Sequence, residues 1–222
     1  MNTYRDKKTG RYIHSPANRN RLLVNELYRA FDHFNKYYAA GSLPQVVITI
    51  QNRGRKNALG WFGQGFWVDK LTDDGTHEIN LSAEFLARGP EQLLETLLHE
   101  MAHLYNAVNN TKDCSGGQYH NKHFKLAAER FGLEVSRIPN RGWAKTSLTD
   151  CSRRQISKLK LDTRLFSGLR RRNVKTAAKK YASLIISEEI YDTVKQAVQQ
   201  SGMTQKEFVE QAVLVQAQLY ND

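Results

Sequence analysis

The sequence predicts an α+β fold followed by a small strand–helix–helix unit, and three observations support the prediction of the larger part. Apolar residues recur at helical spacing in residues 18–40, 90–108 and 121–132. Residues 45–82 instead contain short β-branched and aromatic runs separated by turn signals. The resulting order of helix, three strands, long helix, loop and helix is typical of a sheet with one face covered by helices. The 222 residues also suffice for one core of about 120–150 residues plus a small second unit.

The first predicted helix covers residues 18–40. Leu23, Leu27, Phe31 and Phe34 lie three or four residues apart, and Gly41 provides a stop. The segment before it, residues 1–21, contains six basic side chains and no apolar run of the kind found in signal peptides. We therefore expect a basic tail that leads into the first helix.

Three strands are predicted between this helix and the next. Residues 45–51 are β-branched and follow Pro44, residues 58–68 are aromatic with interspersed glycines, and residues 77–82 alternate apolar and polar side chains after the turn 73–75. For most of the aromatic side chains in the second strand we expect core packing: Trp61, Phe62, Phe66 and Trp67. The alternative is that this strand forms an edge to which an extended peptide binds by strand addition.

The long helix after Pro90 contains the stretch LLETLLHEMAHLYN, which places two histidines four residues apart. Positions i and i+4 share a helix face, so His99 and His103 can bind one metal ion while Glu100 lies beside it. A catalytic zinc ion needs a third protein ligand and keeps one position for water. The adjacent carboxylate can take the proton of that water as it attacks a carbonyl, which predicts Glu100 as the general base.

The apolar residues of the same helix indicate that it is buried. They form one stripe, made of Leu94, Leu97, Leu98, Met101 and Leu104. A buried helix that carries two histidines and a glutamate without a bound ion bears a large desolvation cost. A polar surface helix is the alternative interpretation, and the stripe argues against it.

The third ligand is expected on the following loop or helix, where two candidates occur. His120 and His123 lie in QYHNKHF, and the residues alone leave both open because the two are only one turn apart. The remaining histidines are expected to be structural: His14, His33 and His77.

These motifs resemble those of the SprT-like (Spartan-type) zinc metalloproteases. The resemblance rests on INLS and LLETLLHEMAHLYN, then GGQYHNKHF and KLAAERFGLEV, and it extends from about Leu22 to Gly142. It implies a zincin-like fold, a zinc cofactor (Zn2+) and peptide-bond hydrolysis. It also implies His120 as the third zinc ligand, with Phe124 at the aromatic position of the motif. The substrates implied by the better-understood relatives are proteins attached to DNA, and DNA stimulates their cleavage.

The roles of three further side chains near the predicted site are less specific. The resemblance does not make His123 a zinc ligand. It implies that His123 either contacts the zinc ligands or lies at the N-terminus of the following helix. Tyr119 precedes His120 directly, and Tyr105 lies on the long helix. A tyrosine hydroxyl can stabilise the oxyanion of a metalloprotease, but ring packing explains either tyrosine equally well.

The cysteine content departs from the family pattern. Many bacterial members end in a zinc ribbon built on two cysteine pairs, whereas this chain has only Cys114 and Cys151. Any DNA contact made by such a module must therefore come from elsewhere in this chain. Cys114 is close to the predicted zinc loop and is expected to be a free, packed cysteine, with a competing or redox-sensitive metal ligand as the alternative.

Positive charge is concentrated in one internal segment. The formal net charge is +11, and residues 152–180 contain eleven Lys and Arg against one Asp, while 22–151 is close to neutral. Such a cluster can neutralise several phosphates of DNA, mainly without sequence preference, although a solvated linker is the alternative. The predicted nucleic-acid-binding residues are Arg153, Arg154, Lys158, Lys160, Arg170, Arg171, Arg172 and Lys175.

The last segment, 181–222, is predicted to form a strand and two helices. A β-rich run at 182–186 precedes a helix at 188–200, and a second helix starts at Thr204 with Glu207 three residues later. This stretch resembles the ribbon–helix–helix proteins, which implies a homodimer. The residues at the DNA-reading positions would be Tyr181, Ser183 and Ile185, and Ile185 is a poor base reader. A helical hairpin packed back on the protease domain is the alternative.

The sequence therefore predicts four parts: a basic tail (1–21), a SprT-like metalloprotease domain (22–151), a basic linker (152–180) and a dimerisation or DNA-binding unit (181–222). No run approaches the roughly 18 apolar residues of a membrane helix, and we expect a cytoplasmic protein, nucleoid-associated if it binds DNA. The first functional hypothesis is a zinc endopeptidase that acts on DNA-bound proteins. The second is a dimeric DNA-binding or regulatory protein whose metalloprotease-like core serves as a binding scaffold.

Overall fold

The computed structural model describes residues 3–5, 12–51, 58–166, 169 and 187–220. It divides into two compact units, Met1–Asn173 and Val174–Asp222, which are treated separately below. Several predicted features lie outside the described residues, namely the strand at 182–186 with Tyr181, Ser183 and Ile185, and the basic residues Arg170, Arg171, Arg172 and Lys175.

Four helices form the frame of the first unit: α1 (Pro16–Ala39), α2 (Pro90–Val108), α3 (Lys122–Arg130) and α4 (Asp150–Lys158). Helix α1 begins earlier than predicted because the Ser15 hydroxyl accepts a hydrogen bond from the Asn18 N–H, and Pro16 occupies the first helical position. Part of the segment expected to be a tail is therefore helical. A short hairpin of β1 (Thr3–Arg5) and β2 (Tyr12–His14) precedes this helix.

The three predicted strands form one mixed sheet with the order β3-β5-β4. Strand β3 (Val47–Gln51) pairs in parallel with β5 (Gly75–Ser82), and β4 (Gly60–Val68) pairs antiparallel with β5 on its other side. A 3-10 helix, η1 (Ala83–Arg88), links β5 to α2. Since β4 is one of the two edge strands of this sheet, the predicted alternative of an exposed aromatic edge is geometrically accessible.

A second sheet with the order β6-β7-β9-β8 was not predicted. It consists of β6 (Cys114–Ser115), β7 (Tyr119–His120), β8 (Leu133–Ile138) and β9 (Gly142–Leu148), with the 3-10 helix η2 (Gly116–Gln118) between the first two. Strands β8 and β9 form an antiparallel hairpin, while β7 adds to β9 in parallel through the pair His120 and Gly142. The loop that carries His120 is thus part of a sheet.

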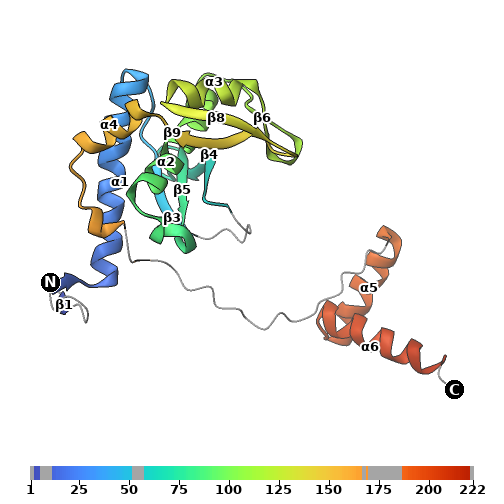
Figure 1. The fold of residues 1–222 in the computed structure, drawn as a ribbon. Helices are drawn as coiled ribbons and strands as arrows, with labels where there is room; N and C mark the ends of the chain where they lie inside the picture. The colour runs from blue at the N-terminus through green and yellow to red at the C-terminus, as the bar shows by residue number, and fades with distance from the viewer. Residues whose placement is uncertain (1–2, 6–11, 52–57, 167–168, 170–186, 221–222) are drawn as a thin grey trace. The chain divides into compact units, whose positions relative to one another are not determined.

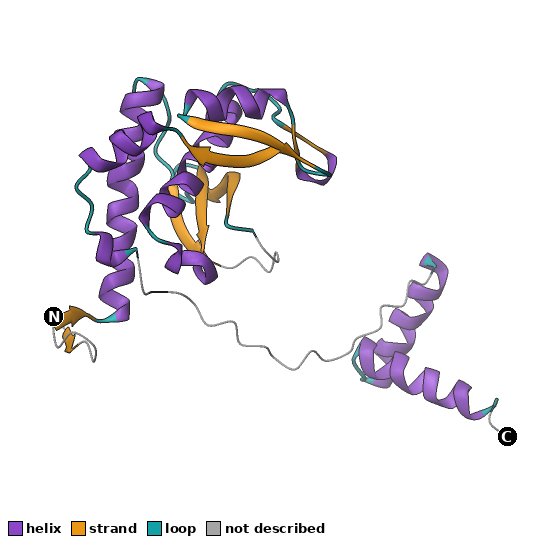
Figure 2. Ribbon diagram, in the orientation of Figure 1, coloured by secondary structure: helices purple, strands orange, loops and turns teal. Residues whose placement is uncertain are grey.

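Helix α2 is the central element of the first unit and packs against β4, β5, β8 and β9, as well as α1 and α3 (Figures 1 and 2). The apolar stripe predicted for this helix is confirmed, because all five of its side chains are fully buried. Burial of these side chains fixes the rotation of α2 about its axis, and with it the direction of the polar residues on the helix.

The folded unit continues past the predicted boundary at residue 151. Ser152 and Gln155 of α4 are buried, and the Ser152 hydroxyl donates to the Gly132 carbonyl oxygen at 2.5 Å. After the 3-10 helix η3 (Thr163–Leu165), Phe166 is fully buried in the same core. Residues 152–166 therefore belong to the first domain and are not a linker. Basic side chains occupy the outer face of α4, which made an amphipathic core helix look like a solvated segment.

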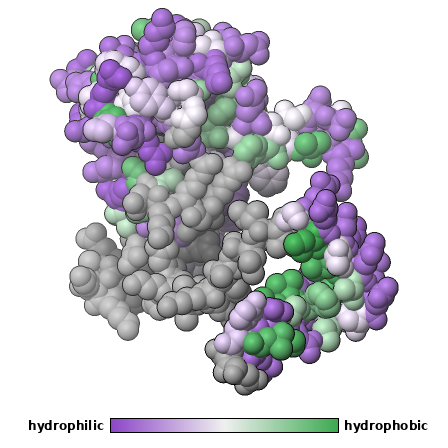
Figure 3. Space-filling model, turned by 90° about the vertical axis from the view of Figure 1, so that its right-hand side faces the viewer, coloured by the Kyte–Doolittle hydropathy of each residue, from purple (hydrophilic) through white to green (hydrophobic). Residues whose placement is uncertain are grey.

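The second unit contains α5 (Glu188–Ser201) and α6 (Gln205–Gln218). The predicted break is present, with Gly202 in the left-handed region (φ 70°), and the predicted capping box joins Thr204 and Glu207. Neither helix has a buried residue, and Figure 3 shows apolar side chains at the surface of this unit.

None of the helices in the described part of the chain combines the length and apolar character needed to cross a membrane.

Candidate metal centre

Three histidines from two elements meet beside the edge strand β4. His99 and His103 come from the same face of α2, and His120 comes from β7. One ligand nitrogen from each of the three lies within 4.8 Å of the other two. His103 Nε2 and His120 Nε2 are 3.2 Å apart.

This donor set fits a tetrahedral zinc ion. With zinc–nitrogen bonds of about 2.0–2.1 Å, two ligand nitrogens of a tetrahedral site lie about 3.3 Å apart. The pKa of His99 falls well below its ordinary value of 6.5 because of burial and then of the other two histidines. Burial and His103 lower the pKa of His120 to about 4. Both imidazoles are therefore held neutral, the form that binds metals.

Phe124, from the first turn of α3, packs against the three histidines. Its ring centroid lies 4.6 Å from that of His99, 4.5 Å from that of His103 and 4.4 Å from that of His120. The Asn121 side chain caps α3 by accepting the main-chain N–H of Phe124, which fixes where this ring enters the core. An apolar wall thus limits the freedom of the ligand rings.

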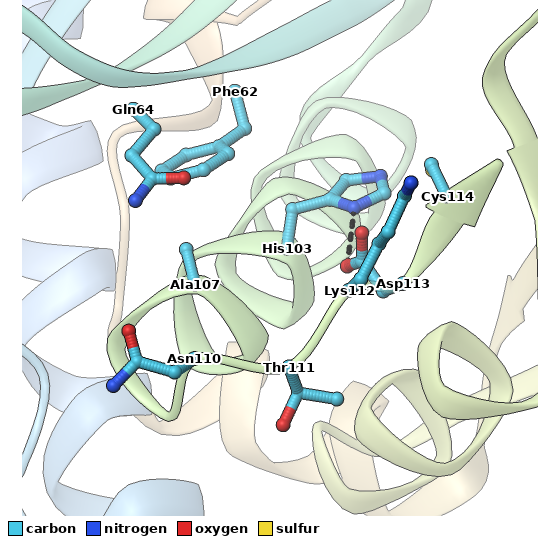
Figure 4. Close-up of a pocket in the computed structure, with 9 residues that line it drawn as sticks. All are labelled: Phe62, Gln64, His103, Ala107, Asn110, Thr111, Lys112, Asp113 and Cys114. Atoms are coloured by element: carbon cyan, nitrogen blue, oxygen red, sulfur yellow. Dashed lines mark hydrogen bonds and ion pairs between the residues drawn. The ribbon is translucent and has the colours of Figure 1, made fainter. Parts of the chain in front are cut away.

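Asp113, which the sequence analysis did not identify, orients His103. Its Oδ2 accepts a hydrogen bond from His103 Nδ1 at 2.8 Å (Figure 4). It accepts another from Asn106 Nδ2 at 3.1 Å. Burial raises the pKa of Asp113, but these hydrogen bonds and the charge of His103 outweigh it, so the pKa is lowered overall. With Nδ1 bound to a carboxylate, His103 directs the lone pair of Nε2 at the metal position.

Glu100 is buried beside the same centre, with 5% of its surface exposed. Burial, reinforced by the charge of Asp113, raises its pKa to about 7, although His103 and the main-chain N–H of Phe62 act in the opposite direction. The hydrogen bond from Phe62 ties the carboxylate of α2 to strand β4. Glu100 therefore faces the space between this strand and the histidines.

Gly60 permits the close approach of β4 to α2. A Cβ at this position would lie 2.7 Å from both the Asn80 carbonyl oxygen and Thr96 Cγ2, and 3.2 Å from Glu100 Oε1. These distances are shorter than normal van der Waals contacts, so a larger residue would push the strand away from the helix. The glycine therefore fixes the width of the site.

Three adjoining depressions form a cleft that follows β4 and α2 through the centre. The first, of about 660 Å³, is lined by Leu59, Gly60, Glu95, His99 and Glu100, among others. The second, of about 500 Å³, contains all three histidines and Glu100. The third, of about 460 Å³, is shown in Figure 4 and is lined by Phe62, Gln64 and residues 110–114. A polypeptide in this cleft would pass directly over the histidines.

Other predicted residues lie elsewhere or have other contacts. The His123 side chain is exposed on α3, and only its carbonyl oxygen reaches the region, accepting from Asn106 at 3.4 Å. The Tyr119 hydroxyl accepts a hydrogen bond from Arg137 at 2.5 Å instead of facing the cleft. Tyr105 packs against Phe131 in the core. Neither tyrosine lines any of the three depressions.

The aromatic strand is divided between core and surface. Trp61 and Phe62 are partly buried and line the cleft. Phe66 and Trp67 are 48% and 45% exposed, so the expected core packing does not hold for them. A β-bulge between Gly63 and Trp67 explains the difference, because it interrupts the regular alternation of side chains between the two faces of the sheet.

Cys114 is a free, half-buried cysteine that lines two depressions, and burial raises its pKa to about 12.

The predicted DNA-contact residues within the described part of the chain lie on or just after α4. Arg154, Lys158 and Lys160 are exposed. Arg153 instead forms an ion pair with Glu91 of α2, so its charge is already partly neutralised. Three of these four positions thus present cationic side chains that have no carboxylate partner among the described ion pairs.

The fold and the centre define a class: an α+β domain with a histidine metal site of the H-E-x-x-H type on its central helix. The family model described as SprT-like matches residues 27–143, more than half of the chain, and the chain belongs to the SprT-like family. Members of this family are generally zinc metallopeptidases. No curated protein and no solved structure matches the chain. These comparisons give no support to the resemblance of residues 181–222 to ribbon–helix–helix proteins.

Proposed function

We propose that the protein is a zinc-dependent endopeptidase that cleaves DNA-associated proteins. The observation that carries this proposal is the meeting of three histidines and a buried glutamate in one open cleft. A binding scaffold has no need of Glu100 at this position, where its burial is costly. The alternative of a purely regulatory DNA-binding protein is therefore less consistent with the site.

The residues have separate tasks in the proposed reaction. A zinc ion held by His99, His103 and His120 would polarise a water molecule and the carbonyl of the peptide bond to be cleaved. Glu100 accepts the proton of the water as its oxygen attacks the carbonyl carbon, and then donates that proton to the departing amine. Phe62 keeps the carboxylate in place through its main-chain N–H.

Strand β4 supports an extended substrate. It is an edge strand of its sheet, and residues 58–62 line two depressions that His99 also lines. A substrate strand that pairs with this edge would lay its scissile bond beside the histidines. Such pairing uses main-chain hydrogen bonds, so it places few limits on the substrate sequence.

We further propose nonspecific DNA contact through the basic face of α4 and the segment that follows it. Residues 152–180 have eleven basic side chains, and Arg154, Lys158 and Lys160 are exposed. Phosphate contacts of this kind weaken steeply as salt is raised and carry little sequence preference. A protease with such a surface would meet its substrates on DNA, at the nucleoid.

The peptidase proposal is tested with purified protein loaded with one equivalent of zinc and an unfolded protein substrate. We expect cleavage by the parent, no cleavage by Glu100→Gln with its zinc retained, and loss of zinc affinity in His120→Ala. The matched control is Glu84→Gln, another glutamate of the same domain that lies outside the cleft. Cleavage by Glu100→Gln at the parent's rate would refute the assignment of the base.

A further inference from the structure

Two polar side chains that do not belong to the histidine cluster face the centre from the second sheet. Gln118, at the end of η2, and Arg141, just before β9, both line the first and second depressions. His99, Glu100 and His120 line the same two depressions. Gln118 and Arg141 therefore adjoin the place where the carbonyl of a bound peptide would lie.

The main chain fixes Arg141 next to His120. The His120 N–H donates to the Arg141 carbonyl oxygen at 3.0 Å. Gly142 allows this approach, because a Cβ there would lie 2.1 Å from the His120 carbonyl oxygen and its φ is +66°. Strand β9 can thus lie close to β7 only with glycine at this position. Arg141 is consequently held in register with a candidate metal ligand.

The Gln118 side chain contacts Arg141 from the end of η2. Gln118 has a φ of 63°, a left-handed conformation that non-glycine residues seldom adopt. Its Oε1 accepts a hydrogen bond from Arg141 Nη1 at 3.4 Å. This contact limits the movement of an otherwise exposed guanidinium and uses only one of its five N–H groups.

The charge of Arg141 is not compensated by a carboxylate among the described ion pairs. Three other arginines of the same unit form such pairs: Arg29 with Glu26, Arg153 with Glu91 and Arg164 with Asp162. Arg137, four residues earlier, is also occupied, since it donates to Tyr119 and lies over the Trp143 ring. Arg141 is therefore a cation available to an anion that forms in the cleft.

We propose that Arg141, positioned by Gln118, stabilises the oxyanion formed when the peptide carbonyl is attacked. The inference rests on the proposed function. As the water oxygen bonds to the carbonyl carbon, the π electrons move to the carbonyl oxygen and the water proton moves to Glu100. Arg141 donates to that oxygen. The electrons return when the carbon–nitrogen bond breaks and the amine takes the proton. Donors placed where charge develops contribute most in a cleft that limits water.

The test compares Arg141→Ala and Arg141→Lys with the parent in steady-state cleavage of one peptide. Removal of an oxyanion donor typically lowers kcat by about 10²–10³, and we expect that loss in Arg141→Ala with KM little changed. The affinity of Arg141→Ala for a peptide that has a phosphinate in place of the scissile bond should fall by a similar factor. Zinc content should be unchanged. Gln118→Ala should show a smaller loss, and Arg137→Ala is the control that should behave like the parent.

Two results would overturn the inference. If Arg141→Ala raises KM while kcat and phosphinate affinity stay at the parent's values, Arg141 only holds the ground-state substrate. If the zinc-loaded parent cleaves no substrate, the proposed function fails and this inference fails with it. The zinc measurement separates both cases from a variant that has simply lost its metal.

Discussion

At the scale of single residues, Asp113 controls the orientation of His103. In Asp113→Asn the hydrogen bond to Nδ1 is weakened and the ring loses the partner that directs Nε2 at the metal. We expect zinc affinity to fall by about 10–100-fold, which is the usual effect of removing the hydrogen-bond partner of a metal ligand. Competition titration with a chromogenic chelator measures the zinc affinity. Asp32→Asn, an exposed carboxylate on α1, is the control; equal affinities in the two variants would contradict the role of Asp113.

Glu95 should make the stability of the fold depend on pH. Burial raises its pKa above the ordinary 4.5, although the hydrogen bond from Thr146 and the charges of Arg88 and Arg153 partly oppose the shift. The folded state therefore favours the protonated carboxyl, and this stabilisation is complete below the unfolded pKa and is lost as pH rises through the folded pKa. The Glu95→Gln side chain does not ionise, so the variant should not lose this stability as pH rises.

The measurement is urea unfolding of the parent and Glu95→Gln from pH 4 to pH 8. The stability of the variant relative to the parent should increase as pH rises above about 4.5 and then level off. A difference that stays constant over this range would show that the Glu95 carboxyl is as well solvated in the folded protein as in the unfolded chain.

Sequence spacing predicted only part of the centre. His99, Glu100 and His103 lie on one helix, whose regular geometry determines which side chains share a face. Asp113, Gln118 and Arg141 reach the centre through loops and a second sheet, and no periodicity links them to α2. His120 was selected from two candidates by family resemblance, because residue spacing alone left His123 open.

At the scale of elements, the contact between β4 and α2 determines the width of the cleft. Gly60→Ala would place a methyl group 2.7 Å from Asn80 and Thr96 and force the strand outward. We expect a destabilisation of about 1–3 kcal/mol, as for other overpacked contacts, together with a large loss of cleavage.

Thermal and urea unfolding, with cleavage measured in parallel, check this prediction. Gly116→Ala is the matched control, since a Cβ at Gly116 meets nothing within 4 Å and its φ is not left-handed. If Gly60→Ala is as stable and as active as Gly116→Ala, the cleft does not depend on this close approach.

The elements with strong periodicity were predicted, and those with mixed patterns were not. The three strands of the first sheet and the helices α1, α2 and α3 follow clear spacings in the sequence. Strands β6 and β7 have two residues each, and β7 pairs with β6 on one side and with the distant β9 on the other. Helix α4 was missed because its basic outer face dominates its composition, while only a few side chains anchor it in the core.

At the scale of the whole molecule, the described residues of the second unit, 187–220, form no core of their own. None of its helical residues is buried, and residues 211–220 of α6 and its end have no charged side chain. Its apolar surface includes Val213, Leu214 and Val215, all more than half exposed. We propose that a second copy covers this surface, since two uncharged segments can pack antiparallel without burying a charge.

Sedimentation equilibrium tests this dimer. The full chain should have twice its 25.5 kDa mass, and Leu214→Glu should be monomeric with unchanged zinc affinity. The control Lys206→Gln, on the first turn of α6, should remain dimeric. A monomeric parent at micromolar concentration would show that another molecule, or none, covers the helices.

The domain boundary could not be predicted from charge alone. The rise in basic residues at 152 marks a change in surface composition, whereas the described part of the chain contributes core residues as far as Phe166. Deletion of the whole basic segment would therefore remove part of the fold along with the charge. Substitution of exposed residues such as Arg154 and Lys158 separates the two effects.

The most direct test of the account is cleavage of a DNA-bound protein by the zinc-loaded chain, with and without DNA, beside Glu100→Gln. The account predicts cleavage by the parent that increases with DNA, declines as salt is raised and is absent in Glu100→Gln, although that variant still binds zinc and DNA. Failure of the parent to cleave with zinc and DNA both bound would contradict the account and favour a DNA-binding scaffold.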